Sequence, residues 1–170
     1  MPEANTIKKA RKAKSEGKSA STQAGEFVRE EIHHVREGKH GARSAKQAIA
    51  IGLSKARKAG VDLKPPAPGT TSERTRKSAA RAYAQGKKAP VQGHTNSRRG
   101  RATLRALQHE GERAASTTAL SRHAHAAAAD RTPSERSAAA KKAVKTKGAP
   151  ARKAAAKKAA RTRAAKSAAS

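Results

Sequence analysis

The chain has 170 residues and contains no cysteine and no tryptophan, and its only conventional aromatic side chains are one phenylalanine and one tyrosine. Without cysteine it has neither a disulfide framework nor a thiolate metal site, which fits a reducing compartment. With so few aromatic rings it lacks the platforms on which proteins stack the bases of single-stranded nucleic acid. Duplex DNA, or RNA read by its shape, is the better match among nucleic acids.

Large apolar side chains are also scarce. Leucine, isoleucine, valine and phenylalanine make up 15 of the 170 residues, far below the roughly 20% under which a highly charged chain is expected to be disordered. Alanine supplies 42 residues of the 35% hydrophobic fraction. One conventional core across the whole chain is therefore excluded. No run approaches the roughly 20 apolar residues of a membrane span, and the basic first 14 residues predict no secretory signal.

Acidic residues are few, with 12 Asp and Glu against 40 Lys and Arg, for a formal net charge of +28. The last 35 residues, 136–170, hold 12 Lys or Arg, 15 Ala and no acid. A segment of this composition repels itself and has little to bury. Its partner must be a polyanion, and nucleic acid is the leading candidate.

The large apolar residues gather in one stretch, since nine of them fall within residues 27–63. Ala24, Val28 and Ile32 recur there at helical spacing, and Gly38 follows as a stop signal. The pattern predicts an amphipathic helix over 21–37.

A second helix is predicted over 45–59. Ser44 and Gln47 form a capping-box pattern at its start, and Gly60 stands where a left-handed C-cap belongs. Gly52 falls on its apolar face, where the absence of a side chain would let the first helix approach closely. The short intervening loop forces the two helices to lie antiparallel or crossed.

These two helices define the expected fold class, which is all-α: a small helical hairpin over 20–63 with a long, largely disordered basic arm rich in Ala and Lys. A hairpin of this size buries little surface and needs a further element or a partner. Ile7, in the basic N-terminal segment 1–19, is one source of a third helix, and Tyr83 is another. A homodimer through the hairpin would serve as well.

The rest of the chain divides by composition. The Pro-rich run 64–69 predicts a stiff linker and a domain boundary. Residues 70–135 form a basic, Ala-rich segment with short helices, one starting at a cap on Thr70 and one over 97–110. Residues 136–170 form the Lys/Ala-rich disordered tail.

The tail begins after a strong helix start, with Thr132 as the cap and Glu135 closing the box. It is of low complexity and nearly repeats itself on either side of Pro150, for which a solvated linker is the plain interpretation. Its charge favours a binding tail that folds in part on DNA as two short basic helices hinged at Pro150. The phosphate-neutralising residues would be Lys141, Lys142, Lys157, Lys158, Arg161 and Arg163.

Two further basic groups are candidate nucleic-acid contacts. Lys39, His40 and Arg43 crowd the positive end of the helix that starts after Ser44, where a phosphate would be favoured; a solvated loop is the alternative. Arg98, Arg99 and Arg101 open the short basic helix. Base reading by a helix-turn-helix is disfavoured, because the loop at about six residues is longer than the usual turn of that motif.

Other chemistry finds little support in the sequence. His123 and His125 are two residues apart and do not share a helical face, and no cysteine joins them, so no metal site is expected. The sequence has no nucleophile elbow, P-loop or paired carboxylates in an apolar setting. We expect no enzyme activity, cofactor or small-molecule substrate. The tail places alanine where a membrane-binding helix has large apolar residues, so no membrane contact is expected.

Residues 19–60 carry a family resemblance, most specific in the run GKHGARSAKQAIAIGLSKARKAG at 38–60. They resemble the N-terminal signature of an uncharacterised family of small basic bacterial proteins, some of which are labelled plasmid stabilisation protein or DNA-binding protein. The resemblance implies a bacterial, cytoplasmic protein and supplies no catalytic residues. The tail is similar in composition to linker-histone tails and to the tails of bacterial histone-like proteins.

The sequence thus predicts a histone-like, nucleoid-associated protein that binds and compacts DNA without regard to sequence, with DNA preferred over RNA. Binding to RNA or the ribosome is the first alternative, because the same charge allows it. The second is a protein-interaction module whose basic tail only localises it.

Overall fold

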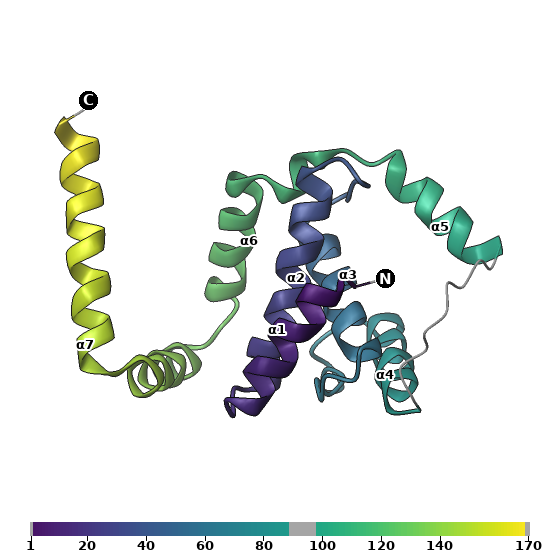
Figure 1. Ribbon diagram of the computed structural model, residues 1–170, viewed down its shortest axis with the longest axis horizontal. Coiled ribbons are helices and arrows are strands. Elements are labelled where there is room, and N and C mark those ends of the chain that lie inside the picture. The colour runs from purple at the N-terminus through teal and green to yellow at the C-terminus, as the bar shows by residue number, and fades with distance from the viewer. Residues whose placement is uncertain (1, 89–97, 169–170) are drawn as a thin grey trace. The chain divides into compact units, whose positions relative to one another are not determined.

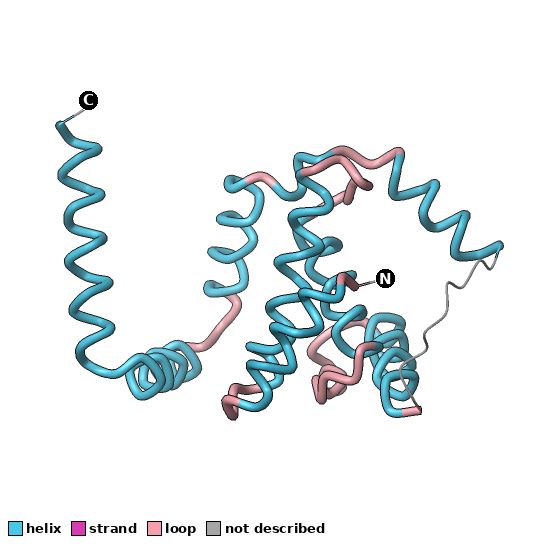
Figure 2. The backbone as a smooth tube through the Cα atoms, in the orientation of Figure 1, coloured by secondary structure: helices cyan, strands magenta, loops and turns pink. Residues whose placement is uncertain are grey.

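The computed structural model describes residues 2–88 and 98–168, and this part of the chain consists of helices and loops without a strand (Figures 1 and 2). The expected all-α class is confirmed. The chain divides into two units, Met1–His123 and Ala124–Ser170. The elements are α1 (Ala4–Ser15), α2 (Ala20–Arg36), α3 (Ala45–Lys58), α4 (Glu73–Lys87), α5 (Arg98–Gln108), the 3-10 helix η1 (Glu112–Ala115), α6 (Thr117–Ala129) and α7 (Pro133–Ala168).

The two helices of the expected hairpin, α2 and α3, lie within a residue of their predicted bounds. Ser19 and Ser44 cap them, each accepting a hydrogen bond from a backbone N–H three residues on. α3 ends as predicted, because Gly60 has a φ of 86° and the Val61 N–H returns to the Ala56 carbonyl at 3.1 Å. Local signals therefore suffice to place both helices.

α2 and α3 pack against each other with their backbones in close approach at Gly52. A Cβ atom added at Gly52 would lie 2.7 Å from Val28 Cα and 3.0 Å from the Phe27 carbonyl oxygen. No side chain fits in that space, so Gly52 has the packing role that its position on the apolar face predicts.

The folded part is larger than a hairpin, which corrects the sequence expectation. α1 packs on α2, α4 packs on α3, and η1 contacts both α2 and α3. The physical reason is the alanine content: of the 14 buried hydrophobic residues in the described chain, 11 are alanine. Small side chains on the basic helices bring their backbones close enough for contact, and a count of large apolar residues overlooks that burial.

Both candidates for a third element are used. Ile7 of α1 packs against the cluster around Phe27. After the Pro-rich linker, α4 packs on α3, and Tyr83 donates a hydrogen bond to Asp62 in the segment that follows α3. The sequence suggested a boundary at residues 64–69, but both sides of that linker lie in the unit Met1–His123.

The cap of α4 differs from the expected one. Ser72, not Thr70, precedes the helix, and its Oγ accepts a hydrogen bond from the Thr75 N–H at 3.3 Å. Glu73 pairs with Arg76 at 2.8 Å instead of closing a box. Ser72 presents the same type of cap two residues later.

The tail is helical in residues 133–168, so the expected disordered arm is not found in this part. The predicted capping box is present: the Glu135 N–H donates to Thr132 Oγ1 at 3.2 Å, and the Thr132 N–H donates to Glu135 Oε2 at 2.8 Å. Two helical segments meet at Gly148, which has a φ of 65°. Alanine has the highest helix propensity of any residue, and here that preference prevails over repulsion between the cations.

None of the described helices is both long enough and apolar enough to cross a membrane.

The contact at Gly52 predicts opposite effects for two Gly→Ala substitutions. Gly52→Ala should destabilise the protein by about 1–3 kcal/mol, because overpacking against α2 outweighs the propensity gain of about 1 kcal/mol. Gly25→Ala is the matched control, since an added Cβ on this α2 glycine meets nothing within 4 Å. It should stabilise by about 0.5–1 kcal/mol. Urea unfolding followed by circular dichroism measures both, and equal shifts of the same sign would contradict the packing.

Candidate nucleic-acid interface

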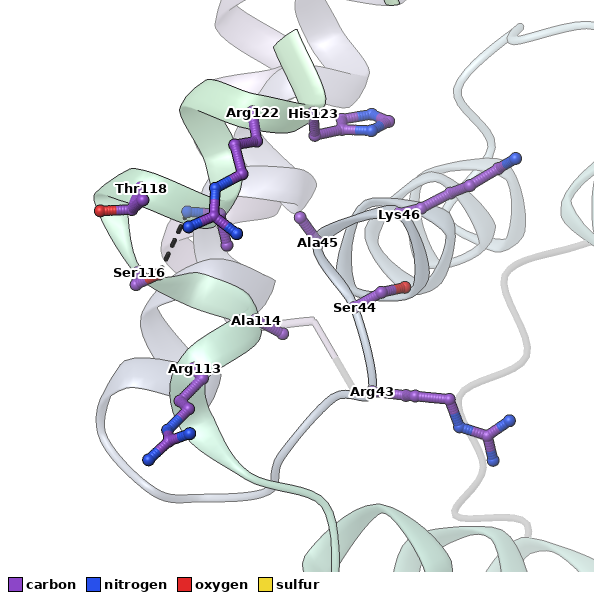
Figure 3. A pocket seen from close by; sticks show the side chains of 11 residues that line it. Arg43, Ser44, Ala45, Lys46, Arg113, Ala114, Ser116, Thr118, Arg122 and His123 are labelled. Carbon is purple, nitrogen blue, oxygen red and sulfur yellow. Dashed lines mark hydrogen bonds between the residues drawn. The ribbon is translucent and has the colours of Figure 1, made fainter. Parts of the chain in front are cut away.

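A basic cavity of about 590 Å³ lies where α3 and α6 begin. Four cationic side chains line it: Arg43, Lys46, Arg113 and Arg122. Figure 3 shows Arg43 and Lys46 on the side of α3, and Arg113 and Arg122 on the side of η1 and α6. The cavity therefore combines two segments about 70 residues apart in the sequence.

Backbone contacts bring these segments together. The Gly41 N–H donates to the Leu107 carbonyl at 2.8 Å, and the Ala42 N–H donates to the Gly111 carbonyl at 3.2 Å. A Cβ at Gly41 would lie 1.7 Å from the Glu110 carbonyl oxygen, so only glycine fits at this crossing. The loop before α3 is thereby fixed against the segment that leads into η1.

Two further hydrogen bonds orient the walls. Arg36 at the end of α2 donates through Nε to the Ala115 carbonyl at 2.8 Å, which holds η1 in place. On the other wall, the Arg43 N–H donates to the Gln47 side chain at 2.7 Å. This bond replaces the expected return of Gln47 to Ser44, and it fixes the backbone of Arg43 at the mouth of the cavity.

The electrostatics of the cavity suit an anion. Among the described residues that line it none is acidic, and the first residues of α3 and α6 both contribute to its wall. The start of a helix carries partial positive charge and backbone N–H groups that favour phosphate. Arg43 lies 3.4 Å from Glu110, whereas Lys46, Arg113 and Arg122 form no ion pair with any part of the chain that the structure describes. These three side chains are therefore not neutralised by an acid of the described chain, although Figure 3 shows Lys46 extending away from Arg113 and Arg122.

The three predicted residues of the loop have different surroundings. Arg43 lines the cavity and is exposed. Lys39 lies 3.1 Å from Glu37 and 3.6 Å from Glu3, and hydrogen bonding to Glu37 raises the pKa of Lys39. His40 points inward, with Nε2 3.2 Å from the buried Glu31. Of the three, only Arg43 lies at the cavity.

The other predicted contacts lie on α5 and α7. Arg98 and Arg99 fall in the first turn of α5, with side chains outside the described part, and Arg101 is exposed on the same helix. The six tail residues are all exposed on α7: Lys141, Lys142, Lys157, Lys158, Arg161 and Arg163.

Sequence reasoning did not identify Lys46, Arg113 or Arg122 as phosphate contacts. A local signal was present, because Ser116 caps the start of α6 by accepting from the Ala119 N–H at 3.1 Å. Basic residues flank that start. Nothing in the sequence, however, indicated that this helix start would lie beside Ser44.

A second group of charged side chains is buried between α2, α3 and the loop. Glu31 is fully buried; one carboxylate oxygen pairs with Lys55 Nζ and the other lies 3.2 Å from His40 Nε2. Beside it, His34 Nε2 lies 3.1 Å from Glu3 and 3.9 Å from the buried Glu30. The hydrogen bond with His34 lowers the pKa of Glu3.

This buried group contains potential cation ligands. One ligand atom from each of Glu31, His34 and His40 lies within 4.8 Å of the other two. The sequence signal for it was the spacing of Glu31 and His34, three residues apart on one helix and therefore on one face. His40 joins them only through the course of the loop.

Comparison with known proteins gives one match. The model of a family of unknown function, DUF6496, matches residues 9–66. This range extends the resemblance seen at residues 19–60 and contains α2, α3 and the loop between them. No curated protein and no solved structure matches the chain. The family description assigns no activity, and Arg113 and Arg122 lie outside the matched range.

The ion pair of Lys55 with Glu31 predicts a large effect on stability. Lys55→Ala should destabilise the protein by about 3 kcal/mol, because it removes the ammonium group from a buried carboxylate. Lys58→Ala, at an exposed position on the same helix, removes the same charge and should change stability by less than about 0.5 kcal/mol. Urea denaturation compares the two, and equal midpoints would show that Lys55 does not stabilise Glu31.

Proposed function

We propose that the protein binds nucleic acid through its phosphates, independently of base sequence, and that it coats and compacts DNA in the bacterial nucleoid. The basic cavity at the starts of α3 and α6 carries this proposal. It joins four cations and two helix starts without an acid among its described lining residues. A phosphate is the common anion that such a site accommodates best.

The proposal assigns two roles to the basic residues. The cavity holds one or a few phosphates in a fixed position, because backbone hydrogen bonds position its walls. α7 supplies exposed cations along a helix, which follow a phosphate backbone without specifying bases. Phosphate contacts of this kind give affinity and orientation but carry no sequence information.

DNA is the proposed target because the net charge of +28 matches a regular polyanion and the chain has few rings for stacking on unpaired bases. The plasmid stabilisation label carried by some members of the family that residues 19–60 resemble is compatible with coating of DNA. Binding to structured RNA, or to a protein partner through the helical unit, is distinguished from DNA binding by mobility-shift titrations and by deletion of residues 136–170.

Affinity for duplex DNA should fall steeply with salt. If α7 neutralises 8–10 phosphates, the log–log slope is roughly −7 to −9, because each neutralised phosphate releases condensed counterions. Removing residues 136–170 should eliminate most of this slope and most of the affinity. Mobility-shift titrations at several salt concentrations measure both quantities.

Three results would contradict that expectation. A slope near −2 would mean that the tail hardly engages phosphate. Tighter binding to ribosomal RNA than to duplex DNA, at equal phosphate concentration, would favour the RNA alternative. Retention of the main cellular contact after deletion of the tail would favour a protein partner.

The contribution of the cavity is separable from net charge. A variant with Arg43, Lys46, Arg113 and Arg122 changed to Gln should lose DNA affinity and reduce the slope by up to about 3–4, because each removed phosphate contact contributes roughly 0.9. The control variant changes four exposed cations of α1 to Gln and removes the same charge: Lys8, Lys9, Arg11 and Lys14. It should have a clearly smaller effect. Equal losses would mean that only total charge matters and that the cavity is not a phosphate site.

A further inference from the structure

The interior of this basic chain contains carboxylate oxygens that accept no hydrogen bond from the residues that the structure describes. Glu30 and Glu31 are both buried, and Glu30 Oε2 and Glu31 Oε1 have no hydrogen-bond partner among the described residues. A buried carboxylate oxygen without a donor is unfavourable by a few kcal/mol. These two oxygens therefore indicate that a positively charged group can be accommodated beside them.

The orientation of His40 points in the same direction. Its Nδ1 lies 3.1 Å from the Gly41 carbonyl, and because a carbonyl only accepts, Nδ1 carries the hydrogen. In the neutral ring Nε2 then presents a lone pair. That nitrogen lies 3.2 Å from Glu31 Oε1 without a hydrogen bond to it. Two lone pairs that face each other at this distance repel, and either a proton on Nε2 or a metal ion bound to both atoms relieves that repulsion.

The distance between His40 and Glu31 agrees with metal coordination. Two ligand atoms about 2.0–2.1 Å from a tetrahedral zinc ion are roughly 3.3 Å apart. The distance of 3.2 Å between His40 Nε2 and Glu31 Oε1 is close to that value. A ring nitrogen of His34 completes a set of three ligand atoms that lie within 4.8 Å of one another.

The surrounding groups support the ligands in the way that metal sites require. Ligating histidines usually donate their second ring N–H to a carbonyl, as His40 does to Gly41. Ligating carboxylates are themselves held by hydrogen bonds, and Lys55 holds the other oxygen of Glu31. Lys55 therefore orients Glu31 and leaves Oε1 for a metal.

We propose that Glu31, His34 and His40 form a binding site for a first-row divalent transition metal, with zinc as the best match. Two imidazoles and one carboxylate suit zinc and its neighbours, whereas calcium and magnesium prefer oxygen ligands alone. Two carboxylates are candidates for a fourth ligand: His34 Nε2 lies 3.1 Å from Oε1 of the exposed Glu3 and 3.9 Å from Oε1 of the buried Glu30.

A metal here would join the last turns of α2 to the loop that precedes α3. Glu31 and His34 belong to α2 and His40 belongs to the loop, so the ion would fix the loop from its inner side. Arg43 follows three residues later and lines the basic cavity. The role assigned to the metal is therefore structural, and it does not depend on what the cavity binds.

Zinc titration of the untagged full-length chain tests the site. Calorimetry should give one tight equivalent for the wild type, and His40→Gln and His34→Gln should each weaken it at least tenfold. His33→Gln is the matched control, because His33 is adjacent in α2 but exposed, and it should leave zinc affinity unchanged. No binding, or equal weakening in all three variants, would overturn the proposal and leave a buried ion-pair network.

A second measurement needs no variant and so does not depend on their folding. When zinc is added to the wild-type chain, the imidazole signals of His34 and His40 should shift in NMR spectra, and the bound state should saturate at one equivalent. Cobalt in place of zinc should give the visible absorption bands of a low-coordinate site with nitrogen and oxygen ligands. Shifts confined to the other histidines would show binding elsewhere and would overturn the assignment.

Discussion

The fold depends on the close approach of the backbones of α2 and α3 at Gly52. Most buried hydrophobic residues in the described chain are alanines, and an alanine contributes contact only when the neighbouring backbone is very near. The same condition recurs at Gly86, where an added Cβ would lie 1.9 Å from the Arg57 carbonyl oxygen. Small residues at the crossing points therefore replace the large side chains that hold most helical proteins together. Once α2 and α3 are in contact, α1 and α4 can each cover one of them.

Much of this fold could be predicted from local sequence, and the part that could not rests on alanine. Apolar spacing, the cap at Ser44 and the stops at Gly38 and Gly60 placed α2 and α3 to within a residue. The packing of α1 and α4 was left open, because their buried faces consist mainly of residues such as Ala10 and Ala79 that also suit an exposed helix. In α7 every alanine whose burial is described is exposed, and there alanine contributes helix propensity alone. Composition cannot distinguish these two uses of alanine, because the difference lies in what packs against it.

The candidate interface was predictable only on the side of α3. Arg43 could be identified because it adjoins a clear helix cap, whereas Arg113 reaches the cavity through contacts such as the hydrogen bond of Arg36 to Ala115, 79 residues apart. His40 shows a second limit of prediction from the sequence. Within a loop rich in cations it looked like one more phosphate contact, but its ring faces Glu31. A carboxylate on the inner face of α2 determines that orientation, and its burial is a property of the assembled helices.

The few acidic residues of the chain thus help to position some of its many basic side chains. Glu3, Glu30 and Glu31 gather at one end of α2, next to a loop that contains a basic residue on either side of Gly41. The ring of His40 faces inward towards Glu31, and backbone hydrogen bonds hold the following residues against the segment before η1. The position of Arg43 therefore depends mainly on the contacts of the residues before it in the loop. Its own ion pair with Glu110 is exposed, and exposed ion pairs contribute little to stability. Repulsion among the cations alone would not hold Arg43 in one position. The backbone hydrogen bonds of Gly41 and Ala42, together with the inward-facing His40, position one wall of the basic cavity before any ligand arrives.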